Sequence, residues 1–286
     1  SPEDVVHRVF AEQVFGGHAL GRETAGERDS VRSLTGDDVR RFFGDHYRAS
    51  NAVIAVAGAV DVDTVIERVS SAFAGLPAGD GRVARDEPIG AGDSVDIDDD
   101  TEQVHVVVGG RSISRTDPDR EALDVVNHVL GGGLSSRLFD EIRERRGLAY
   151  SVFSSAAAYA DAGMWSVYAG SLPEHADEVR TLVGVEIDRL IAEGITADEL
   201  DIAQGYLSGS YEMGLEDSGA RMTRLGGQLT VHGRVRPIEE QIERWMSVTL
   251  DDARRVIERV YAAPTLTVTL GPRARRRGAK RVRSTA

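Results

Sequence analysis

The densest group of residues that could do chemistry runs from Gly131 to Val152. It reads Gly131-Gly-Gly-Leu-Ser-Ser-Arg-Leu-Phe-Asp-Glu-Ile-Arg-Glu-Arg-Arg-Gly-Leu-Ala-Tyr-Ser-Val152, which indicates three glycines, a short cationic helix and the start of a strand. Arg143 and Tyr150 stand near the helix-to-strand turn, where both side chains could face one cleft. A guanidinium can hold a carboxylate or a carbonyl oxygen, and a phenol can donate a hydrogen bond to a peptide oxygen. The pattern fits a binding surface, and it also fits a solvated basic helix end.

The histidines do not form a metal-binding pattern. They are His7, His18, His46, His105, His128, His175 and His232. No two of them have the spacing of H-x-x-E-H, H-E-x-x-H or H-x-x-x-H, in which two ligands share one face of a helix. The chain also has no cysteine, so thiolate ligands and a cysteine nucleophile are excluded. We therefore predict that this chain alone binds no metal.

Two further stretches resemble other kinds of site only superficially. Asp93–Glu102 holds six acidic residues, but a calcium loop starting at Asp96 would place Thr101 where glycine is required. A solvated linker or a guarded edge strand is the better interpretation. Gly131–Gly133 follows a helix and lacks the Lys-Ser/Thr pair of a phosphate loop, and the chain has no G-x-S-x-G motif. We predict no nucleotide site and no catalytic residue in this chain.

Composition narrows the class of protein. Apolar residues make up 41% of the 286 residues and charged residues 28%, which is typical of a globular protein. The net charge of −13 argues against binding to nucleic acid. No apolar run approaches the roughly 18 residues of a membrane span, so the default prediction is a cytoplasmic protein without one. Seven Lys and Arg residues and no acid lie in 272–286, which we interpret as a basic disordered tail.

Helical and strand periodicities alternate around the patch. Apolar residues at helical spacing predict helices over 61–73, 117–130, 135–145, 173–192, 196–216 and 238–246. The opening Ser1-Pro2-Glu3-Asp4 is typical of a helix start. Strands are predicted over 104–108, 150–158 and 163–169. Antiparallel strand pairs with helices in separate runs indicate an α+β fold.

The chain contains an internal repeat with a constant offset of 214. Ser33–Tyr47 resembles Ser247–Tyr261, with identical Ser, Thr, Asp-Asp, Arg-Arg and Tyr residues. In each copy a threonine, Thr35 or Thr249, can cap a helix, and a β-rich run follows at 52–58 or 266–271. Such a long period indicates a duplicated domain. Because residues 92–214 have no partner in the chain, we expect roughly the first two thirds of one copy to precede Ser1.

These observations predict an α+β fold of duplicated two-layer domains. Each domain would have an antiparallel or mixed sheet with helices on one face, and the first copy would be incomplete. We place the second part of an N-terminal domain at 1–76, a linker rich in Gly, Pro and charge at 77–93, and a C-terminal domain at 94–271.

The patch resembles the C-terminal-domain signature of the pitrilysin/insulinase family of zinc metallopeptidases. It is most similar to the branch of the mitochondrial processing peptidase and small bacterial processing proteases. Phe15-Gly-Gly-His-Ala-Leu-Gly-Arg22 and Tyr47-Arg-Ala-Ser-Asn-Ala-Val-Ile-Ala-Val-Ala-Gly58 resemble the second half of that family's N-terminal domain. The resemblance covers nearly the whole chain, and the family is also built from two duplicated α+β domains.

The resemblance implies roles for particular residues. Family members carry H-x-x-E-H, with two zinc ligands and a Glu that activates water, and a further Glu ligand downstream. All of these would precede Ser1, so zinc would belong to the full-length parent and not to this chain. An Arg and a Tyr seven residues apart contact the substrate in the family, and Arg143 and Tyr150 match that spacing. Gly131, Gly132 and Gly133 match a glycine-rich stretch near the substrate chamber.

Two functions follow as expectations. In the first, the chain is the C-terminal portion of a zinc-dependent metalloendopeptidase that cleaves peptides in a chamber between two domains, and it supplies substrate-binding residues. In the second, it is a non-catalytic regulatory or structural subunit of a hetero-oligomer. The expected partners are a peptide substrate and either the missing N-terminal segment or a second subunit of the family. The chain alone is expected to be inactive.

Overall fold

The computed structural model describes residues 1–83, 85, 86, 88 and 90–272 of the chain. Its helices are α1 (Pro2–Phe15), α2 (Arg28–Ser33), α3 (Gly36–His46), α4 (Val62–Ala72), α5 (Arg120–Asn127), α6 (Ala176–Glu193), α7 (Ala197–Gly214), α8 (Ser218–His232), α9 (Ile238–Met246) and α10 (Leu250–Val256). Its strands are β1 (Val95–Asp98), β2 (Val104–Ser112), β3 (Ala149–Ala158), β4 (Gly163–Ser171) and β5 (Leu266–Gly271). The predicted α+β class is confirmed.

The five strands form one mixed sheet in the order β1-β5-β2-β4-β3. β2, β4 and β3 pair antiparallel, and so do β2 and β5, whereas β1 pairs parallel to β5. The acidic stretch at 93–102 therefore contributes the edge strand β1, which is one of the two interpretations that its composition favoured. β3, which follows the Gly131–Arg146 patch, forms the opposite edge.

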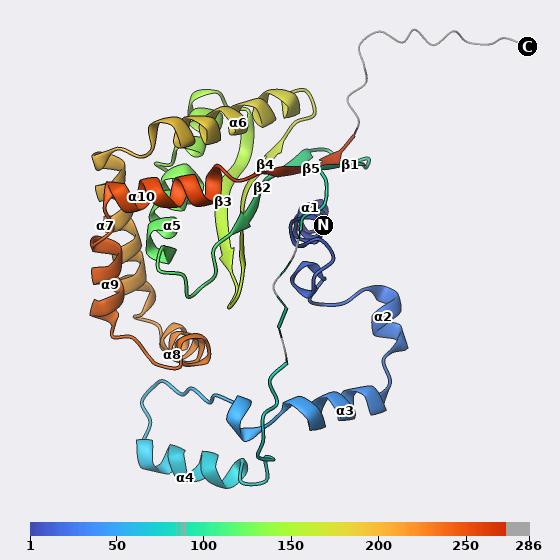
Figure 1. The fold of residues 1–286 in the computed structure, drawn as a ribbon, viewed down its shortest axis with the longest axis vertical. Coiled ribbons are helices and arrows are strands. Elements are labelled where there is room, and N and C mark those ends of the chain that lie inside the picture. Colours follow the sequence, from blue (N-terminus) through green and yellow to red (C-terminus); the bar gives the residue numbers. More distant parts are fainter. Residues whose placement is uncertain (84, 87, 89, 273–286) are drawn as a thin grey trace, which may run out of the picture.

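One face of the sheet packs against α5, α6, α7 and α10 (Figure 1). Trp165 of β4 is the largest fully buried side chain, and its ring lies 4.5 Å from that of Tyr261, which follows α10. Leu123 and Val126 of α5 are also fully buried in this core. Burial of each such side chain contributes about 1.5–3 kcal/mol, so this face supplies much of the stability of the domain.

The other face of the sheet is covered by α1, from the beginning of the chain (Figure 1). Ser1 caps α1 through a capping box with Asp4, as the opening residues predicted. Val6, Phe10 and Val14 recur on one side of the helix and are fully buried against residues of β2, β4 and β5. A helix from the predicted N-terminal region thus completes the core of the sheet at 95–271.

The two copies of the repeat have the same local structure. Thr35 and Thr249 each form a capping box, with Asp38 and Asp252 respectively, at the start of α3 and α10. The offset of 214 also relates α1 to α8, which contains the equivalent positions 218–229. The sequence repeat is therefore a repeat of the helices.

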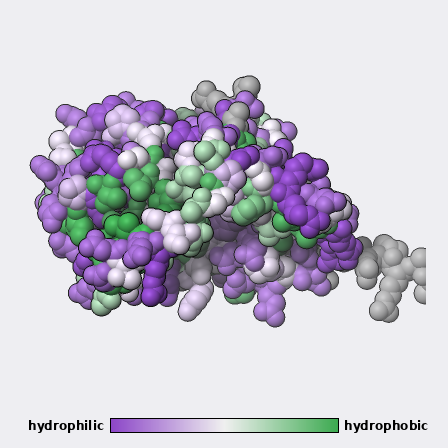
Figure 2. Space-filling view, turned by 90° about the horizontal axis from the view of Figure 1, so that it is seen from below, coloured by the Kyte–Doolittle hydropathy of each residue, from purple (hydrophilic) through white to green (hydrophobic). Residues whose placement is uncertain are grey.

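The environments of the two copies differ sharply. Phe42 and Phe43 of α3 are 57% and 53% exposed, whereas their counterparts Val256 and Ile257 are fully buried. None of the residues of α2, α3, α4 and α8 is buried. Figure 2 views the molecule from the side where α3 and α4 lie in Figure 1, and apolar residues gather there in patches.

The β-rich run at 52–58 does not form a strand. Its counterpart β5 lies between β1 and β2, but no described strand pairs with 52–57. A strand requires a partner for its backbone hydrogen bonds, and the run is left as extended chain beside α8. A Cβ placed on Gly226 of α8 would lie 3.4 Å from the Cβ of Ala55. Helix α1 of the first copy thus packs on β5 of the second copy, and α8 of the second copy lies against residues 52–57 of the first.

Residues 77–93, the predicted linker, have no helix or strand where they are described. Part of the linker lies beside α1 in space. There the Gly92 amide donates to the Gln13 carbonyl over 2.6 Å. Residues 273–286 of the predicted basic tail lie outside the described residues. In the part of the chain that is described, no helix has the length and apolar character needed to cross a membrane.

A cluster of aromatic and histidine rings joins α1 to the sheet. His7 of α1 lies 5.3 Å from the ring of Tyr168, whose hydroxyl is 2.9 Å from Nδ1 of His105 on β2. Burial lowers the pKa of both histidines and raises that of Tyr168 to about 12, while Glu3 opposes the effect on the histidines. Asp4 also opposes it for His7. The interface therefore favours neutral imidazoles.

We expect the chain to lose stability below about pH 6.5. The unfolded chain takes up protons on His7 and His105 at higher pH than the folded chain does, so the free energy of unfolding falls as the pH falls. Urea unfolding at pH 7.5 and 5.5 should show this decrease, and a smaller one in His7→Phe, which keeps a ring but cannot titrate. Equal pH dependence in the two proteins would exclude His7 from the effect.

Candidate functional site

The three glycines mark a break in the helix that follows β2. α5 ends at Asn127, the next turn (His128–Gly132) is π-helical, and Gly131 leaves the helical conformation with φ −161°. A Cβ on Gly131 would lie only 2.5 Å from the backbone nitrogen of Ser154 on β3. The hydroxyl of Ser154 donates to the Asn127 carbonyl over 2.8 Å. The loop can therefore approach the edge strand closely only because this position has no side chain.

Arg137 fixes the next segment to α7. Its side chain is 9% exposed and donates to both carboxylate oxygens of Glu199, over 2.6 and 2.7 Å. It also donates to the Gly194 carbonyl over 2.8 Å. A bidentate guanidinium–carboxylate pair has a fixed geometry, so Arg137 acts as an anchor of the loop.

The chain then winds as a π-helix over Phe139–Arg145 and turns into β3. Gly147, with φ +64°, provides the left-handed conformation that this turn needs. Arg143 lies near the end of the helix and Tyr150 near the start of β3, so the turn brings them together. The Cζ atom of Arg143 lies 5.0 Å from the centre of the Tyr150 ring and 4.8 Å from that of Phe139.

Arg143 differs from its neighbours in its partners. Arg145 and Arg146 are both ion-paired, with Asp140 at 2.8 Å and Glu141 at 2.7 Å respectively. Among the described residues, the guanidinium of Arg143 contacts the two aromatic rings and has no carboxylate partner. Tyr150 is 78% exposed. Both side chains are therefore available to a ligand, and the aromatic stack restrains the guanidinium at low entropic cost.

The three predicted glycines line a hollow, and Phe139 connects this hollow to Arg143. Gly131, Gly132 and Gly133 border a hollow of about 660 Å³, and Phe139 both borders this hollow and stacks on Arg143. Sequence reasoning missed other residues around the hollow, namely His128, Phe139, Phe153 and Tyr206. His128 and Phe139 flank the glycines in the sequence, but nothing in the sequence places Tyr206 of α7 beside them.

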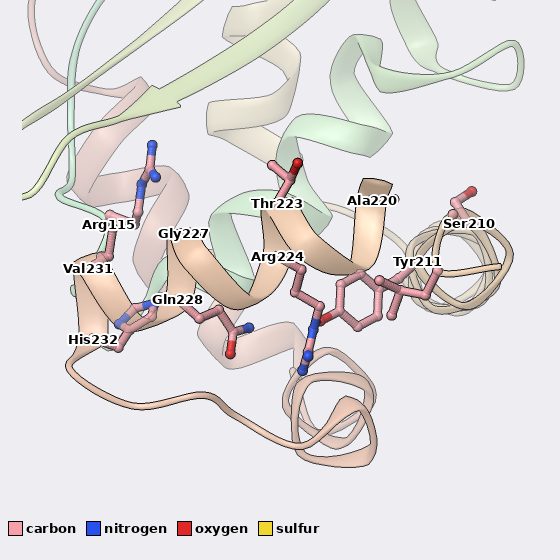
Figure 3. Close-up of a pocket in the computed structure, with 12 residues that line it drawn as sticks. Arg115, Ser210, Tyr211, Ala220, Thr223, Arg224, Gly227, Gln228, Val231 and His232 are labelled. Atoms are coloured by element: carbon pink, nitrogen blue, oxygen red, sulfur yellow. The ribbon is translucent and has the colours of Figure 1, made fainter. Parts of the chain in front are cut away.

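A second hollow, of about 550 Å³, lies along α8 (Figure 3). Arg115 donates to the Ala158 carbonyl over 2.9 and 2.6 Å, and Arg224 donates to the Tyr211 hydroxyl and the Arg236 carbonyl. These arginines hold the protein's own elements together, which accounts for their presence without a ligand.

The residues present do not fit a zinc ion. In the described part of the chain, no group of three or more His, Cys, Asp or Glu side chains is arranged to hold a metal. The prediction that this chain alone binds no zinc stays a prediction.

Comparison with known proteins decides the family. A family model described as "Peptidase M16 inactive domain" matches residues 33–207, which is more than half of the chain. The chain belongs to the M16 peptidase family. The resemblance to the pitrilysin/insulinase family is thereby confirmed, whereas its place near the mitochondrial processing peptidase stays a prediction.

Longer relatives are similar to this chain over most of its length. An "uncharacterized zinc protease" of Streptomyces coelicolor is 42% identical over 281 residues, covering 95% of this chain and 61% of the relative. One of Mycobacterium tuberculosis is 38% identical over 285 residues, covering 96% and 64%. The crystal structure of an M16 inactive domain from Pseudomonas fluorescens superposes with a TM-score of 0.88 at 23% identity, over 96% of this chain and 66% of that one. The chain thus spans less than two thirds of the length of these curated relatives.

We predict that Gly131→Ala destabilises the M16 chain by about 1–3 kcal/mol, because the added methyl group would force the loop away from β3. Gly205→Ala in α7 is the matched control. A Cβ there meets nothing within 4 Å, so this change should stabilise by about 0.5–1 kcal/mol. Urea unfolding followed by circular dichroism measures both. If Gly131→Ala were as harmless as the control, the close approach to β3 would not constrain the loop.

Proposed function

We propose that this chain is the C-terminal portion of a zinc-dependent metalloendopeptidase and that it supplies substrate contacts rather than the zinc site. The observation that carries the proposal is the guanidinium of Arg143, which has no carboxylate partner among the described residues and lies beside the exposed phenol of Tyr150. Membership of the M16 family and the longer relatives named zinc proteases support it. Zinc would be bound by residues of the full-length enzyme outside this chain. We retain the cytoplasm as its proposed location.

In this proposal Arg143 and Tyr150 hold the backbone of an extended peptide. The guanidinium has donors in a fixed plane, and the phenol donates a further hydrogen bond, so both can bind peptide carbonyl oxygens. Donors that are already in place stabilise negative charge on such an oxygen during hydrolysis. Gly131–Gly133 would border the same binding surface.

The first copy of the repeat has exposed apolar side chains, and these suggest what the chain binds. Exposed apolar side chains lie on α3 and α4 and in the run 52–57, which pairs with no described strand. By contrast, α10 packs into the core and β5 lies inside the sheet. We infer that a second sheet, from the remainder of the full-length protein or from another family subunit, pairs with 52–57 and covers these helices. On such a second sheet, α8 would cover one face in the way that α1 covers one face of the described sheet.

We expect Arg143→Ala and Tyr150→Phe to lower peptide cleavage by the full-length enzyme. Loss of one donor to the developing oxyanion typically lowers kcat by about 10²–10³-fold. Cleavage of a quenched fluorescent peptide measures the effect, and the zinc content of each variant should stay equal to that of the wild type. Arg145→Ala is a matched control, because Arg145 is paired with Asp140 on the same helix.

Unchanged cleavage in both variants would remove Arg143 and Tyr150 from the site. If the wild-type full-length protein bound no zinc and cleaved no peptide, but formed a stable hetero-oligomer, the non-catalytic subunit would be the correct function. The wild-type measurement therefore separates the two functions before any variant is examined.

We expect Phe42→Asp to weaken binding of the second sheet by about 10- to 100-fold, because one large side chain would no longer be buried. The probe is the region of the Streptomyces coelicolor relative that lies outside the matched residues, and binding is measured by calorimetry. Arg40→Ala on the same helix is the control, since the side chain of Arg40 is 75% exposed and pairs with Asp37. Equal affinities of the Phe42 variant and the wild type would show that α3 is not covered in this way.

A further inference from the structure

The hollow beside Gly131–Gly133 has enough room for a large side chain. Its walls come from distant parts of the chain: Leu134 from the loop, Phe139 from the π-helix, Phe153 from β3 and Tyr206 from α7. These walls are mostly apolar, and among the described residues that line it none is Lys or Arg. An anion would therefore find no counter-charge there, whereas an apolar group would find about 660 Å³ of space.

One buried polar group lines this hollow. His128 is 6% exposed, and its ring stacks on Tyr206 with 4.3 Å between the ring centres. On its other side are Gly132 and Gly133, where added Cβ atoms would lie 3.1 Å and 2.8 Å from the imidazole. The ring nitrogens have no hydrogen-bond partner among the described residues, and they are not among the fully buried unpartnered atoms, so they stay accessible to a ligand. Burial lowers the pKa of His128, so the neutral ring can both donate and accept.

Phe139 links the hollow to the proposed peptide site. Its ring borders the hollow and also lies 4.8 Å from Cζ of Arg143, whose other side faces Tyr150. A peptide whose backbone is held by Arg143 and Tyr150 would place a neighbouring side chain within reach of the hollow. The contacts for backbone and side chain would then share one wall.

We propose that this hollow is a specificity pocket for a large aromatic side chain of the peptide substrate. The pocket favours tyrosine over phenylalanine, because the phenol can hydrogen-bond to His128 while the ring lies against Phe139, Phe153 and Tyr206. This assignment rests on the proposed function, since it takes the ligand to be a peptide held by Arg143 and Tyr150.

Four peptides of the form acetyl-Ala-Ala-X-Ala-Ala-amide, with X as Tyr, Phe, Leu or Ala, test the pocket. They are titrated into the 286-residue chain while NMR follows the imidazole signals of His128. We expect the Phe peptide to bind about 10- to 100-fold more tightly than the Ala peptide, from burial of the ring. The Tyr peptide should gain about a further 2- to 10-fold from the hydrogen bond. Equal affinities for all four, or no binding up to millimolar concentration, would overturn the pocket.

Variants separate the pocket from the backbone contacts. His128→Leu should abolish the preference for Tyr over Phe, whereas His128→Gln, which keeps a donor and an acceptor, should retain part of it. Circular dichroism shows whether each variant remains folded. Arg143→Ala should weaken all four peptides by the same factor. If Arg143→Ala weakens them all but X has no effect, the backbone site stands and the pocket fails. If X matters but Arg143→Ala does nothing, the pocket stands and the proposed role of Arg143 fails.

Discussion

Both faces of the five-stranded sheet need an apolar cover, and this requirement connects the two ends of the chain. Alternate residues of β2 show it most clearly: Val106 and Val108 enter the core beneath the helices α5, α6, α7 and α10, while Val107 enters the core beneath α1. The second core consists largely of α1 and β5, which lie more than 250 residues apart in the sequence. The helix that seals this face belongs to the first copy of the repeat. The two copies are therefore held together by a shared core as well as by the continuous chain between them.

The repeat shows which properties are local and which depend on the rest of the protein. The capping boxes at Thr35 and Thr249 are the same because each needs only four consecutive residues. Burial differs because it needs a sheet, and among the described residues only the second copy has one. Residues 52–57 are β-rich like β5 and still form no strand, since composition cannot supply a hydrogen-bonding partner. The first copy thus has its helices in place and its apolar faces open.

This difference also sets the limits of prediction from the sequence. The helix at 238–246 was predicted with the bounds that α9 has, and the strands β3 and β4 within a few residues, because periodicity and caps act over short distances. The π-helical turns at His128–Gly132 and Phe139–Arg145 were not predicted, since their geometry depends on how the loop packs against Ser154 of β3. Arg143 and Tyr150 were selected by their residue types near a predicted helix-to-strand turn and by the resemblance to the family. Their contact with Phe139 required the turn, and the approach of Tyr206 to His128 required the whole fold.

The position of β3 at the edge of the sheet makes the candidate site open to a ligand. An inner strand would be flanked on both sides, whereas the free side of β3 is approached by the glycine loop, which leaves a hollow beside Phe153. The glycines let the loop come close to the strand and to His128 without filling that hollow. Arg137 then ties the following segment to α7, so the loop, the π-helix and Tyr206 are held relative to one another. The hollow bordered by Phe139, and the guanidinium of Arg143 that stacks on the same ring, are therefore consequences of how the edge of this sheet is covered.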